Sequence, residues 1–355
     1  MEQLVKWEKA KQAIIEAKSV DELLLIRDQA EAFRYAAKQA KESIDAVNNI
    51  AEIRIRAERR AGEFLSEPTN KQKPGQYQQR STDSTVAPTL KELKVSKTES
   101  SNWQNIANIP QDDFEEHIEK TKKRKAELTT AGVLSLAKDI KRDALRKERS
   151  EQGKSAILPD NTKLYNDDFR CFRNADVEYG SVDLILTDPP YPKEYIPLWR
   201  DLGVFALDYL KKDGYLIAYS GQLYLDIVIQ ELSKTMSYCW TFCLYHTGHT
   251  QLVHSRNVIC EWKPILVFKN GDPGKFRDTI SDVLPSEKRD KTLHDWQQNK
   301  SAPEYIVNHF TNPGDVVCDP MAGAGTFLKV AKNLNRKIVG MEIDEKSYNI
   351  IKAEL

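Results

Sequence analysis

The segment Val182-Asp-Leu-Ile-Leu-Thr-Asp-Pro-Pro-Tyr191 joins a run of apolar residues to an acid, two prolines and an aromatic residue. The run 182–187 is short and apolar, which predicts a buried strand that ends at Thr187. Ligands of open α/β sheets bind just beyond the carboxyl ends of the strands. The sequence therefore places Asp188–Tyr191 where a ligand is expected.

Further apolar runs of strand length accompany this segment and are separated by stretches of helical or loop composition. They are residues 215–220, 241–246, 265–268, 315–319 and 337–343. Strands that alternate with helices in this way predict a doubly wound α/β sheet over residues 156–355.

Small residues fill the loop after the predicted strand 315–319. Residues 313–326 read PGDVVCDPMAGAGT, and a helix is expected to begin near Phe327. Glycines let the backbone approach a ligand closely, and an acid such as Glu342 at the tip of the next strand is the usual partner of two ribose hydroxyls. A nicotinamide or flavin site is the rival interpretation, but Leu328 stands where the third glycine of G-x-G-x-x-G belongs. A cofactor without a pyrophosphate fits the loop better, and S-adenosylmethionine is such a cofactor.

The residue types in Asp188–Tyr191 suit the task of holding a flipped-out base by its exocyclic amino group. The two prolines fix the backbone and leave its carbonyl groups free to accept hydrogen bonds. If the Asp188 carboxylate and the Pro189 carbonyl accept hydrogen bonds from the two amine N–H groups, the nitrogen moves toward sp³ geometry and its lone pair can attack a methyl group. Tyr191 would stack on the extruded base. A proline-rich turn without chemistry is the alternative.

Together the two motifs resemble those of the DNA amino-methyltransferases that modify adenine N6 or cytosine N4, over about residues 156–355. Their order, DPPY first and the glycine loop last, is the circularly permuted order of that family's β class. The resemblance implies a Rossmann-like methyltransferase fold that uses S-adenosylmethionine, releases S-adenosylhomocysteine and needs no metal. The implied catalytic residues are Asp188, Pro189, Pro190 and Tyr191. The implied cofactor-binding residues are Asp168, Phe169, Asp319, Pro320, Ala322, Gly323, Gly325, Thr326, Glu342, Ile343 and Gln298.

Two of these assignments rest on weaker matches to the family. Only one helix follows Glu342, so the third cofactor-binding strand is expected before the DPPY motif, at residues 162–169. There Asn166–Phe169 resembles a Gly-Asp-aromatic motif with Asp167 in place of glycine, which implies that Asp168 contacts the adenine amine of the cofactor and that Phe169 flanks its ring. Residues 294–299 and a helix over 303–310 resemble the remaining cofactor motif, with Gln298-Asn299 where a Lys-Pro pair is usual.

Residues 1–65 predict an all-helical N-terminal region because they contain no proline and long tracts of helix-forming residues. Ser19 is expected to cap a second helix that begins at about Asp21 and runs to about Leu65. So long a pattern predicts an antiparallel hairpin or a dimerising coiled coil, and hence a homodimer. Residues 66–88 contain three prolines and no apolar periodicity, which predicts a linker.

Residues 89–150 predict a DNA-binding module. The expected elements are a short helix over 89–93, a turn over 95–97 and a second helix over 98–109. This segment resembles the helix-turn-helix of phage-type DNA methyltransferases and plasmid-partition proteins, with Lys94 where glycine is usual. A packing unit without DNA contact, with Trp103 and Ile106 facing inward, is the alternative. The expected DNA-contacting residues are Lys97, Ser100, Asn102, Gln104, Lys122, Lys123 and Arg124.

The composition limits the compartment and the partners. Residues 1–150 carry 29 Lys and Arg against 25 Asp and Glu, although the whole chain is neutral. The basic runs 120–125 and 141–149 fit either a phosphate-facing stripe or solvated helix faces. No apolar run is long enough for a membrane span or a secretory signal, and five cysteines in strand-like contexts fit free thiols in the cytoplasm.

These patterns favour a DNA methyltransferase that acts on adenine N6, because in the resembled family Asp rather than Ser tends to open the motif of adenine enzymes. The alternatives are a cytosine-N4 enzyme, a DNA-binding regulator with a degenerate methyltransferase domain, and an enzyme acting on RNA or protein amides. A cysteine-nucleophile cytosine-C5 enzyme is excluded, since no Pro-Cys dipeptide occurs.

A zinc site at Cys239, Cys243, His246 and His249 is disfavoured, since strand alternation scatters these side chains. No nuclease-like carboxylate-lysine group is evident, which favours a stand-alone methylase of phage or prophage type.

Overall fold

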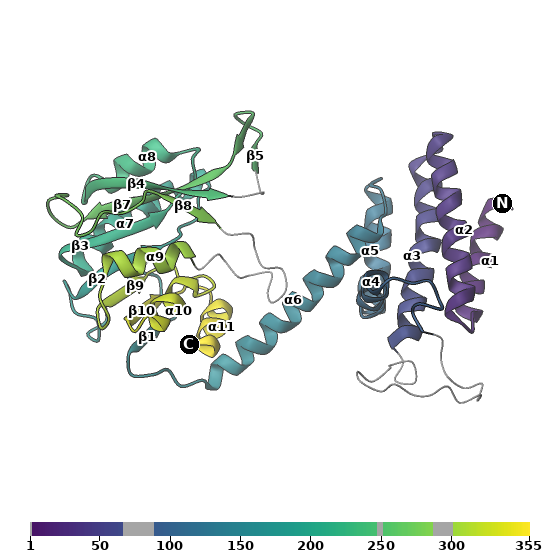
Figure 1. The fold of residues 1–355 in the computed structure, drawn as a ribbon, viewed down its shortest axis with the longest axis horizontal. Coiled ribbons are helices and arrows are strands. Elements are labelled where there is room, and N and C mark those ends of the chain that lie inside the picture. Colours follow the sequence, from purple (N-terminus) through teal and green to yellow (C-terminus); the bar gives the residue numbers. More distant parts are fainter. Residues whose placement is uncertain (1, 67–88, 247–250, 287–300) are drawn as a thin grey trace. The chain divides into compact units, whose positions relative to one another are not determined.

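The computed structural model describes residues 2–66, 89–246, 251–286 and 301–355. The chain divides into two compact units, residues 1–145 and 146–355, and the boundary falls within helix α6 (Thr130–Ser155) (Figure 1). The first unit is helical, and the second contains a mixed sheet with helices. The expected fold class, an α/β domain preceded by an all-α region, is therefore confirmed.

The helical unit is organised around α3, which contacts α1, α2, α4 and α5. Besides the first part of α6, its helices are α1 (Glu2–Glu16), α2 (Val20–Gln39), α3 (Ile44–Ser66), α4 (Lys97–Ala107) and α5 (Gln111–Lys123). Ile53 of α3 packs in one apolar cluster with Leu23 of α2, and Ile55 packs in a second cluster with Phe114 of α5. Burial on two sides explains why α3 is the structural centre of this unit.

The single long helix expected from about Asp21 to Leu65 is divided in two. Ser19 does cap α2, since its hydroxyl accepts a hydrogen bond from the Glu22 amide. However, Lys41 adopts a left-handed conformation with φ 55°, and the amides of Lys41 and Glu42 bond back to Lys38 and Ala37. This C-terminal motif ends α2 without a glycine, and α2 and α3 are two separate helices that pack against each other.

The short helix expected over residues 89–93 is also absent from the structure. Residues 90–94 form hydrogen-bonded turns, and Lys94 has φ 54°, the conformation that glycine adopts most readily. The second expected helix is present as α4, and Ser96 and Glu99 form a capping box at its start. Trp103 and Ile106 are buried, as expected.

Gly62 allows α3 and α4 to pack closely. A Cβ atom at Gly62 would lie 2.1 Å from the backbone oxygen of Trp103 and 2.4 Å from its carbonyl carbon. We expect Gly62→Ala to lower the free energy of unfolding of the helical unit by about 3 kcal/mol, the upper range for overpacking, because backbone must move. Urea unfolding followed by circular dichroism measures the change.

Gly132→Ala is the matched control, since a Cβ there would meet only side-chain atoms at 3.4 Å and beyond. This substitution within α6 should stabilise the unit by about 0.5–1 kcal/mol. Equal stabilities for the two variants would contradict the packing described for α3 and α4.

The second unit is built on one eight-stranded sheet in the order β1-β10-β9-β2-β3-β7-β4-β8. Its strands are β1 (Thr162–Tyr165), β2 (Val182–Thr187), β3 (Leu210–Tyr219), β4 (Ser237–His246), β7 (Trp262–Lys269), β8 (Val283–Ser286), β9 (Val316–Asp319) and β10 (Lys337–Met341). A separate two-stranded ribbon consists of β5 (Gln251–Val253) and β6 (Val258–Cys260). All the strands expected from the sequence are present.

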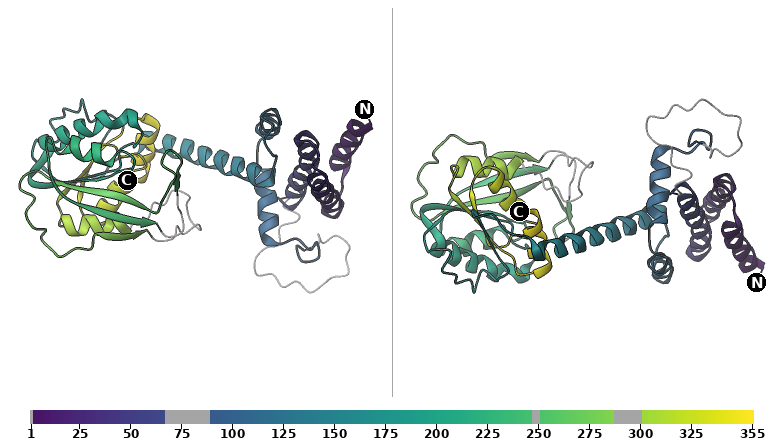
Figure 2. Two further views of the ribbon diagram at one scale, coloured as in Figure 1. Left: turned by 90° about the horizontal axis from the view of Figure 1, so that it is seen from above. Right: turned by 90° about the horizontal axis from the view of Figure 1, so that it is seen from below.

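Helices cover both faces of this sheet (Figure 2). They are α7 (Ile196–Tyr209), preceded by the 3-10 turn η2 (Lys193–Tyr195), α8 (Leu225–Leu232), α9 (Ser301–Phe310), α10 (Thr326–Asn333) and α11 (Glu345–Glu354). Side chains alternate between the two cores along β3: Ile217 joins the cluster with α9 and α10, and Leu216 joins the cluster with α7 and α8. Burial on both faces accounts for the continuous apolar runs of the sequence.

Strand pairing supports the permuted order of the motifs. β1 pairs in parallel with β10, with Leu164 opposite Gly340, so the strand before the DPPY motif lies beside the strand that ends near Glu342. The sequence patterns do not reveal that β7 runs antiparallel between β3 and β4. An apolar strand looks the same in either direction, so its orientation depends on the connections around it.

Candidate active site

Four parallel strands bring the chemically distinctive residues of the second unit to one edge of the sheet. Asp188 follows β2, Asp319 ends β9, Glu342 follows β10, and Asn166 follows β1. The side-chain amide of Asn166 donates a 2.7 Å hydrogen bond to the backbone oxygen of Glu342, which connects the loop after β1 to the loop after β10. The motifs that are far apart in the chain therefore meet at the carboxyl edge, where α/β sheets bind ligands.

Both carboxylate oxygens of Asp188 have a partner. The Tyr191 hydroxyl donates a hydrogen bond to Oδ1, and the Lys263 ammonium lies 3.6 Å from Oδ2. Lys263 also lies 4.9 Å from the centre of the Tyr191 ring, within range of a cation–π contact. Burial and the charge of Asp188 raise the pKa of Tyr191, so this residue stays a neutral donor.

Gly221 shapes the other side of Tyr191. A Cβ atom at Gly221 would lie 3.2 Å from both Cβ and Cγ of Tyr191. The backbone after β3 can therefore lie directly against the tyrosine, which fixes the position of the side chain that completes the DPPY motif.

Asp319 is buried at the end of β9 and is 1% exposed. Burial raises the pKa of Asp319 to about 7, and the charges of Asp188 and Glu342 add to the rise. The neighbouring Thr187 side chain and the Met321 amide act in the opposite direction, the latter by a 3.2 Å hydrogen bond to Oδ1. A buried carboxylate facing two other acids is suited to a positively charged ligand.

The glycine loop is held on Glu342. Gly323 and Gly325 have φ angles of 53° and 70°, which other residues rarely adopt. The Gly323 amide donates to Oε2 of Glu342 at 2.7 Å, and the Asp344 amide donates to Oε1 at 2.9 Å. These bonds place the Glu342 carboxylate between the loop and the end of β10.

A buried hydroxyl at this edge is available to a ligand. Tyr219 is 5% exposed, and its hydroxyl has no hydrogen-bond partner among the described residues. Its ring packs 5.2 Å from that of Phe327, at the start of the helix that follows the glycine loop. Buried polar groups are nearly always paired in native proteins, so a bound molecule with a polar group would satisfy this site. Together with the acids Asp319 and Glu342, these residues fit a cofactor that carries both ribose hydroxyls and a positive charge.

The other cofactor-binding residues expected from the sequence have mixed positions. Pro320 and Ala322 are buried under the loop, Thr326 is half-buried at the start of α10, and Ile343 is 68% exposed beside Glu342. Gln298 lies outside the described residues.

Asp168 and Phe169, both expected to contact the cofactor, have partners within the protein. Arg170 holds the Asp168 carboxylate through Nε at 3.0 Å and keeps the pKa of that carboxyl below its usual range. Phe169 is 3% exposed and packs edge-on against Phe205, 5.6 Å away. Its ring therefore packs in the core under α7, and its expected contact with the cofactor's ring stays a prediction.

Two of the residues expected to contact DNA are engaged within the helical unit. Ser100 is 4% exposed and accepts a 3.0 Å hydrogen bond from Gln104. Lys122 pairs with Glu52 and donates to Asn49 at 2.8 Å, which offsets the cost of burying the Glu52 carboxylate. Both side chains take part in packing within the unit, and their expected contacts with DNA stay predictions. The others keep accessible side chains: Lys97, Lys123 and Arg124 are exposed, and Asn102 and Gln104 are half-buried.

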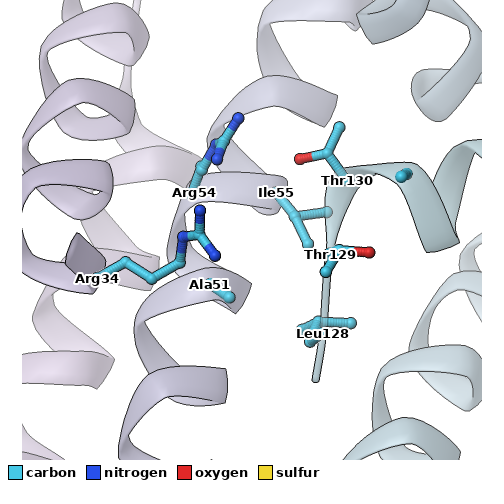
Figure 3. A pocket seen from close by; sticks show the side chains of 8 residues that line it. Arg34, Ala51, Arg54, Ile55, Leu128, Thr129 and Thr130 are labelled. Atoms are coloured by element: carbon cyan, nitrogen blue, oxygen red, sulfur yellow. The ribbon is translucent and has the colours of Figure 1, made fainter. Parts of the chain in front are cut away.

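A concavity of about 210 Å³ in the helical unit contains Arg34 and Arg54 opposite Thr129 and Thr130 (Figure 3). Its cations are already paired. Arg34 binds Glu31 at 2.8 Å, and Arg54 binds Glu31 at 2.7 Å and Glu58 at 2.9 Å. An anionic ligand would have to displace these carboxylates, so the carboxyl edge of the sheet is the better site.

Comparison with known proteins identifies the part of the chain that contains the glycine loop. Residues 219–353, less than half of the chain, match the family described as DNA methylase, of the N6/N4 type. Residues 219–353 are thus similar to DNA methylases of the N6/N4 type. The matched region begins after Asp188–Tyr191, so the role of that motif rests on its position in the sheet.

Individual relatives are Type II methyltransferases. M.HpaI of Haemophilus parainfluenzae is 22% identical over 223 residues, which cover 51% of this chain and 70% of the relative. M.BglII of Bacillus subtilis is 41% identical over 88 residues, and the chain spans only 23% of its length.

Two solved structures align with the same share of the chain. The M1.HpyAVI–SAM complex aligns with a TM-score of 0.44 at 20% identity, covering 54% of this chain and 97% of that protein. PvuII DNA methyltransferase, described as cytosine-N4-specific, aligns with a TM-score of 0.45 at 18% identity, covering 54% and 87%.

Two further kinds of feature, membrane-spanning helices and metal-ligand clusters, are absent from the described residues. None of the helices in the described ranges combines the length and apolar character that crossing a membrane requires. Within the same residues, no three potential metal ligands converge.

Lys263, Gly221 and Tyr219 are the site residues that the sequence patterns miss. Lys263 lies at the start of β7, 75 positions after Asp188, and no motif links the two. The only feature of Lys263 in the sequence is its charge beside an apolar strand, and such a charge is common in sheet proteins.

Proposed function

We propose that this chain transfers a methyl group from S-adenosylmethionine to the exocyclic amino group of a base flipped out of duplex DNA, with adenine N6 as the target. The observation that carries the proposal is the meeting of Asp188–Tyr191 with Asp319 and the Glu342-bound glycine loop at one sheet edge. A base-holding motif beside a cofactor-holding loop is the arrangement that methyl transfer to an amine requires.

Asp188 and Tyr191 act on the base. The Asp188 carboxylate and the Pro189 carbonyl accept hydrogen bonds from the two N–H groups of the amine, so the nitrogen lone pair can attack the methyl carbon. In the free protein, Lys263 and the Tyr191 hydroxyl lie where the amine must approach Asp188. Lys263 is the partner that leaves more easily, since its contact is 3.6 Å long and its side chain is 28% exposed. After transfer the new carbon–nitrogen bond is complete, and the nitrogen releases its surplus proton to Asp188 or to water.

Asp319, Glu342 and the glycine loop act on the cofactor. When bound, S-adenosylmethionine supplies a methyl group on a positively charged sulfur that leaves as a neutral thioether. Asp319 offers a buried negative charge to this cation, Glu342 offers acceptors to ribose hydroxyls, and Gly323 permits close approach of the backbone.

The N-terminal unit serves DNA binding and dimerisation in this proposal. Lys97, Lys123 and Arg124 are exposed cations that suit phosphate contacts. Four large apolar side chains on α1 and α2, Ile15, Leu25, Phe33 and Tyr35, are between 61% and 67% exposed. Such a surface supports association with a second copy of the chain.

Removing two phosphate-facing charges should weaken DNA binding in a salt-dependent way. For the double variant Lys123→Gln/Arg124→Gln we expect the slope of log affinity against log salt to decrease in magnitude by about 2, since each contact releases close to one counterion. Fluorescence anisotropy with a labelled duplex at several salt concentrations measures the slope.

The double variant Lys9→Gln/Lys18→Gln removes the same charge from exposed positions on or just after α1 and is the control. An equal change of slope in both variants would show that net charge alone, rather than residues 123 and 124, determines binding.

The direct test of the proposed activity is incubation with S-adenosylmethionine and unmethylated duplex DNA, followed by analysis of the nucleosides. N6-methyladenine is the expected product. N4-methylcytosine would retain the mechanism and change the base.

A further inference from the structure

The β5–β6 ribbon precedes the start of β7, which lies at the edge of the sheet where β3 ends and where Lys263 meets Asp188. Figure 1 shows the ribbon, labelled at β5, extending away from the sheet. It is inserted between β4, which ends at His246, and β7, which begins at Trp262. Tyr245 of β4 pairs with Trp262, and the next residue, Lys263, lies 3.6 Å from Asp188. The base of the ribbon is therefore adjacent to the proposed base pocket.

Two contacts fix the root of the ribbon. The Cys260 thiol donates a hydrogen bond to Oε1 of Gln222 at 2.8 Å, and Gln222 follows the glycine that lies against Tyr191. The His246 amide donates to the Glu261 carbonyl at 2.8 Å, which continues the pairing of β4 with β7. These bonds hold the ribbon in a defined position relative to the DPPY motif.

The ribbon is small, and its exposed apolar side chains indicate that a partner covers it. Its strands have three residues each, and Leu252, Val258 and Ile259 are 42%, 50% and 60% exposed. An isolated two-stranded ribbon is marginally stable in water, and apolar side chains grouped on such an element indicate that a partner covers it.

The tip of the ribbon carries side chains that form hydrogen bonds. His254, Ser255, Arg256 and Asn257 are all exposed, and the Arg256 and Asn257 side chains form no hydrogen bond or ion pair with other described residues. Arginine pairs with guanine and asparagine with adenine by two hydrogen bonds each in the major groove, which is wide enough for a two-stranded ribbon. Apolar side chains beside them can contact thymine methyl groups.

We propose that the β5–β6 ribbon enters the major groove beside the flipped base and that Arg256 and Asn257 determine which flanking base pairs are accepted. This inference rests on the proposed function, because it assigns the recognition of the same DNA substrate. Duplex DNA is the occupant that the site favours, since the ribbon begins at the pocket that must receive a base from that duplex.

The experiment maps methylated sites in the genomic DNA of a methylation-free host that expresses the full chain. The variants are Arg256→Ala and Asn257→Gly, and glycine is chosen because Asn257 has φ 53°. Each variant should methylate additional sites that differ from the wild-type site at one position. We expect discrimination at that position to fall by about 5- to 150-fold, the range for losing one bidentate base contact.

Arg277→Ala is the matched control. Arg277 is an exposed arginine of the same unit that hydrogen-bonds to Asn312 at 3.0 Å, and it should leave the site preference unchanged. Thermal unfolding of each variant checks that the second unit is folded.

Three results would overturn the inference. An unchanged site preference in both ribbon variants would show that other residues read the DNA. A uniform loss at all sites would indicate a phosphate contact, and a loss of dimer without relaxed specificity would show that a second copy covers the ribbon. If the wild-type chain methylates no DNA, the proposed function itself fails, which separates that result from the others.

Discussion

Asp188→Ala is expected to lower the rate of methyl transfer by about 10²- to 10³-fold, the usual effect of removing one preorganised hydrogen-bonding group at a reacting centre. The reason is that the amine loses the carboxylate that accepts a hydrogen bond from one of its N–H groups and draws the nitrogen toward sp³ geometry. Affinity for the cofactor should be retained, since Glu342 and the glycine loop do not contact Asp188 through hydrogen bonds. Single-turnover transfer of a labelled methyl group measures the rate, and calorimetry with S-adenosylmethionine measures the affinity.

Asp183→Asn is the matched control for this prediction. Asp183 is a carboxylate near the opposite end of the same strand, where it pairs with Lys211 at 2.6 Å and accepts the Val316 amide at 2.8 Å. It should leave single-turnover transfer within about twofold of the wild type, because it lies outside the carboxyl edge. A fully active Asp188→Ala variant would contradict the mechanism.

Asp319→Asn is expected to stabilise the second unit while it weakens cofactor binding. The folded-state pKa of about 7 lies above the usual value of 3.8. Between these two values the unfolded chain loses its proton while the folded protein keeps it, so stability falls as the pH rises and then levels off above about 7. The asparagine variant has no carboxyl group to ionise, so it does not lose this stability as the pH rises. Its free energy of unfolding should exceed that of the wild type by about 2–4 kcal/mol at pH 8 and by almost nothing at pH 4.

The same substitution removes the buried charge that faces the proposed cofactor. Affinity for S-adenosylmethionine should fall by roughly 10- to 100-fold, because hydrogen bonds to charged groups contribute about 1.5–3 kcal/mol. Urea unfolding at pH 4 and pH 8 and calorimetry at pH 8 measure the two effects. Asp160→Asn, at an exposed position of the same unit, is the control. A variant that binds the cofactor as tightly as the wild type would remove Asp319 from the site.

Much of the sheet could be predicted because its strands carry a simple signal. Strands buried on both faces give continuous apolar runs, and β2, β9 and β10 were recognisable for that reason. The carboxyl ends of parallel strands meet at one edge of a sheet, and the parallel pairing of β2 with β9 brings Asp188 and Asp319 to the same edge. Placing β1 beside β10 followed from the same reasoning.

The features that the sequence does not reveal depend on contacts between distant segments. The end of α2 at Lys41 has no glycine or proline to announce it, and the left-handed turn forms because α2 and α3 bury Leu23 and Ile53 together. Ser100 and Lys122 look like polar surface residues until Gln104 and Glu52 are placed beside them. Lys263 reaches Asp188 only through the antiparallel strand β7, whose direction the apolar pattern leaves open.

Mass spectrometry of nucleosides is the most direct measurement of the central claim. The full chain is incubated with unmethylated duplex DNA and S-adenosylmethionine, with the Asp188→Ala variant in parallel. The account expects N6-methyladenine from the wild type and a loss of about 10²-fold or more from the variant. Wild-type protein that binds the cofactor but leaves every exocyclic amine of the DNA unmethylated would contradict it.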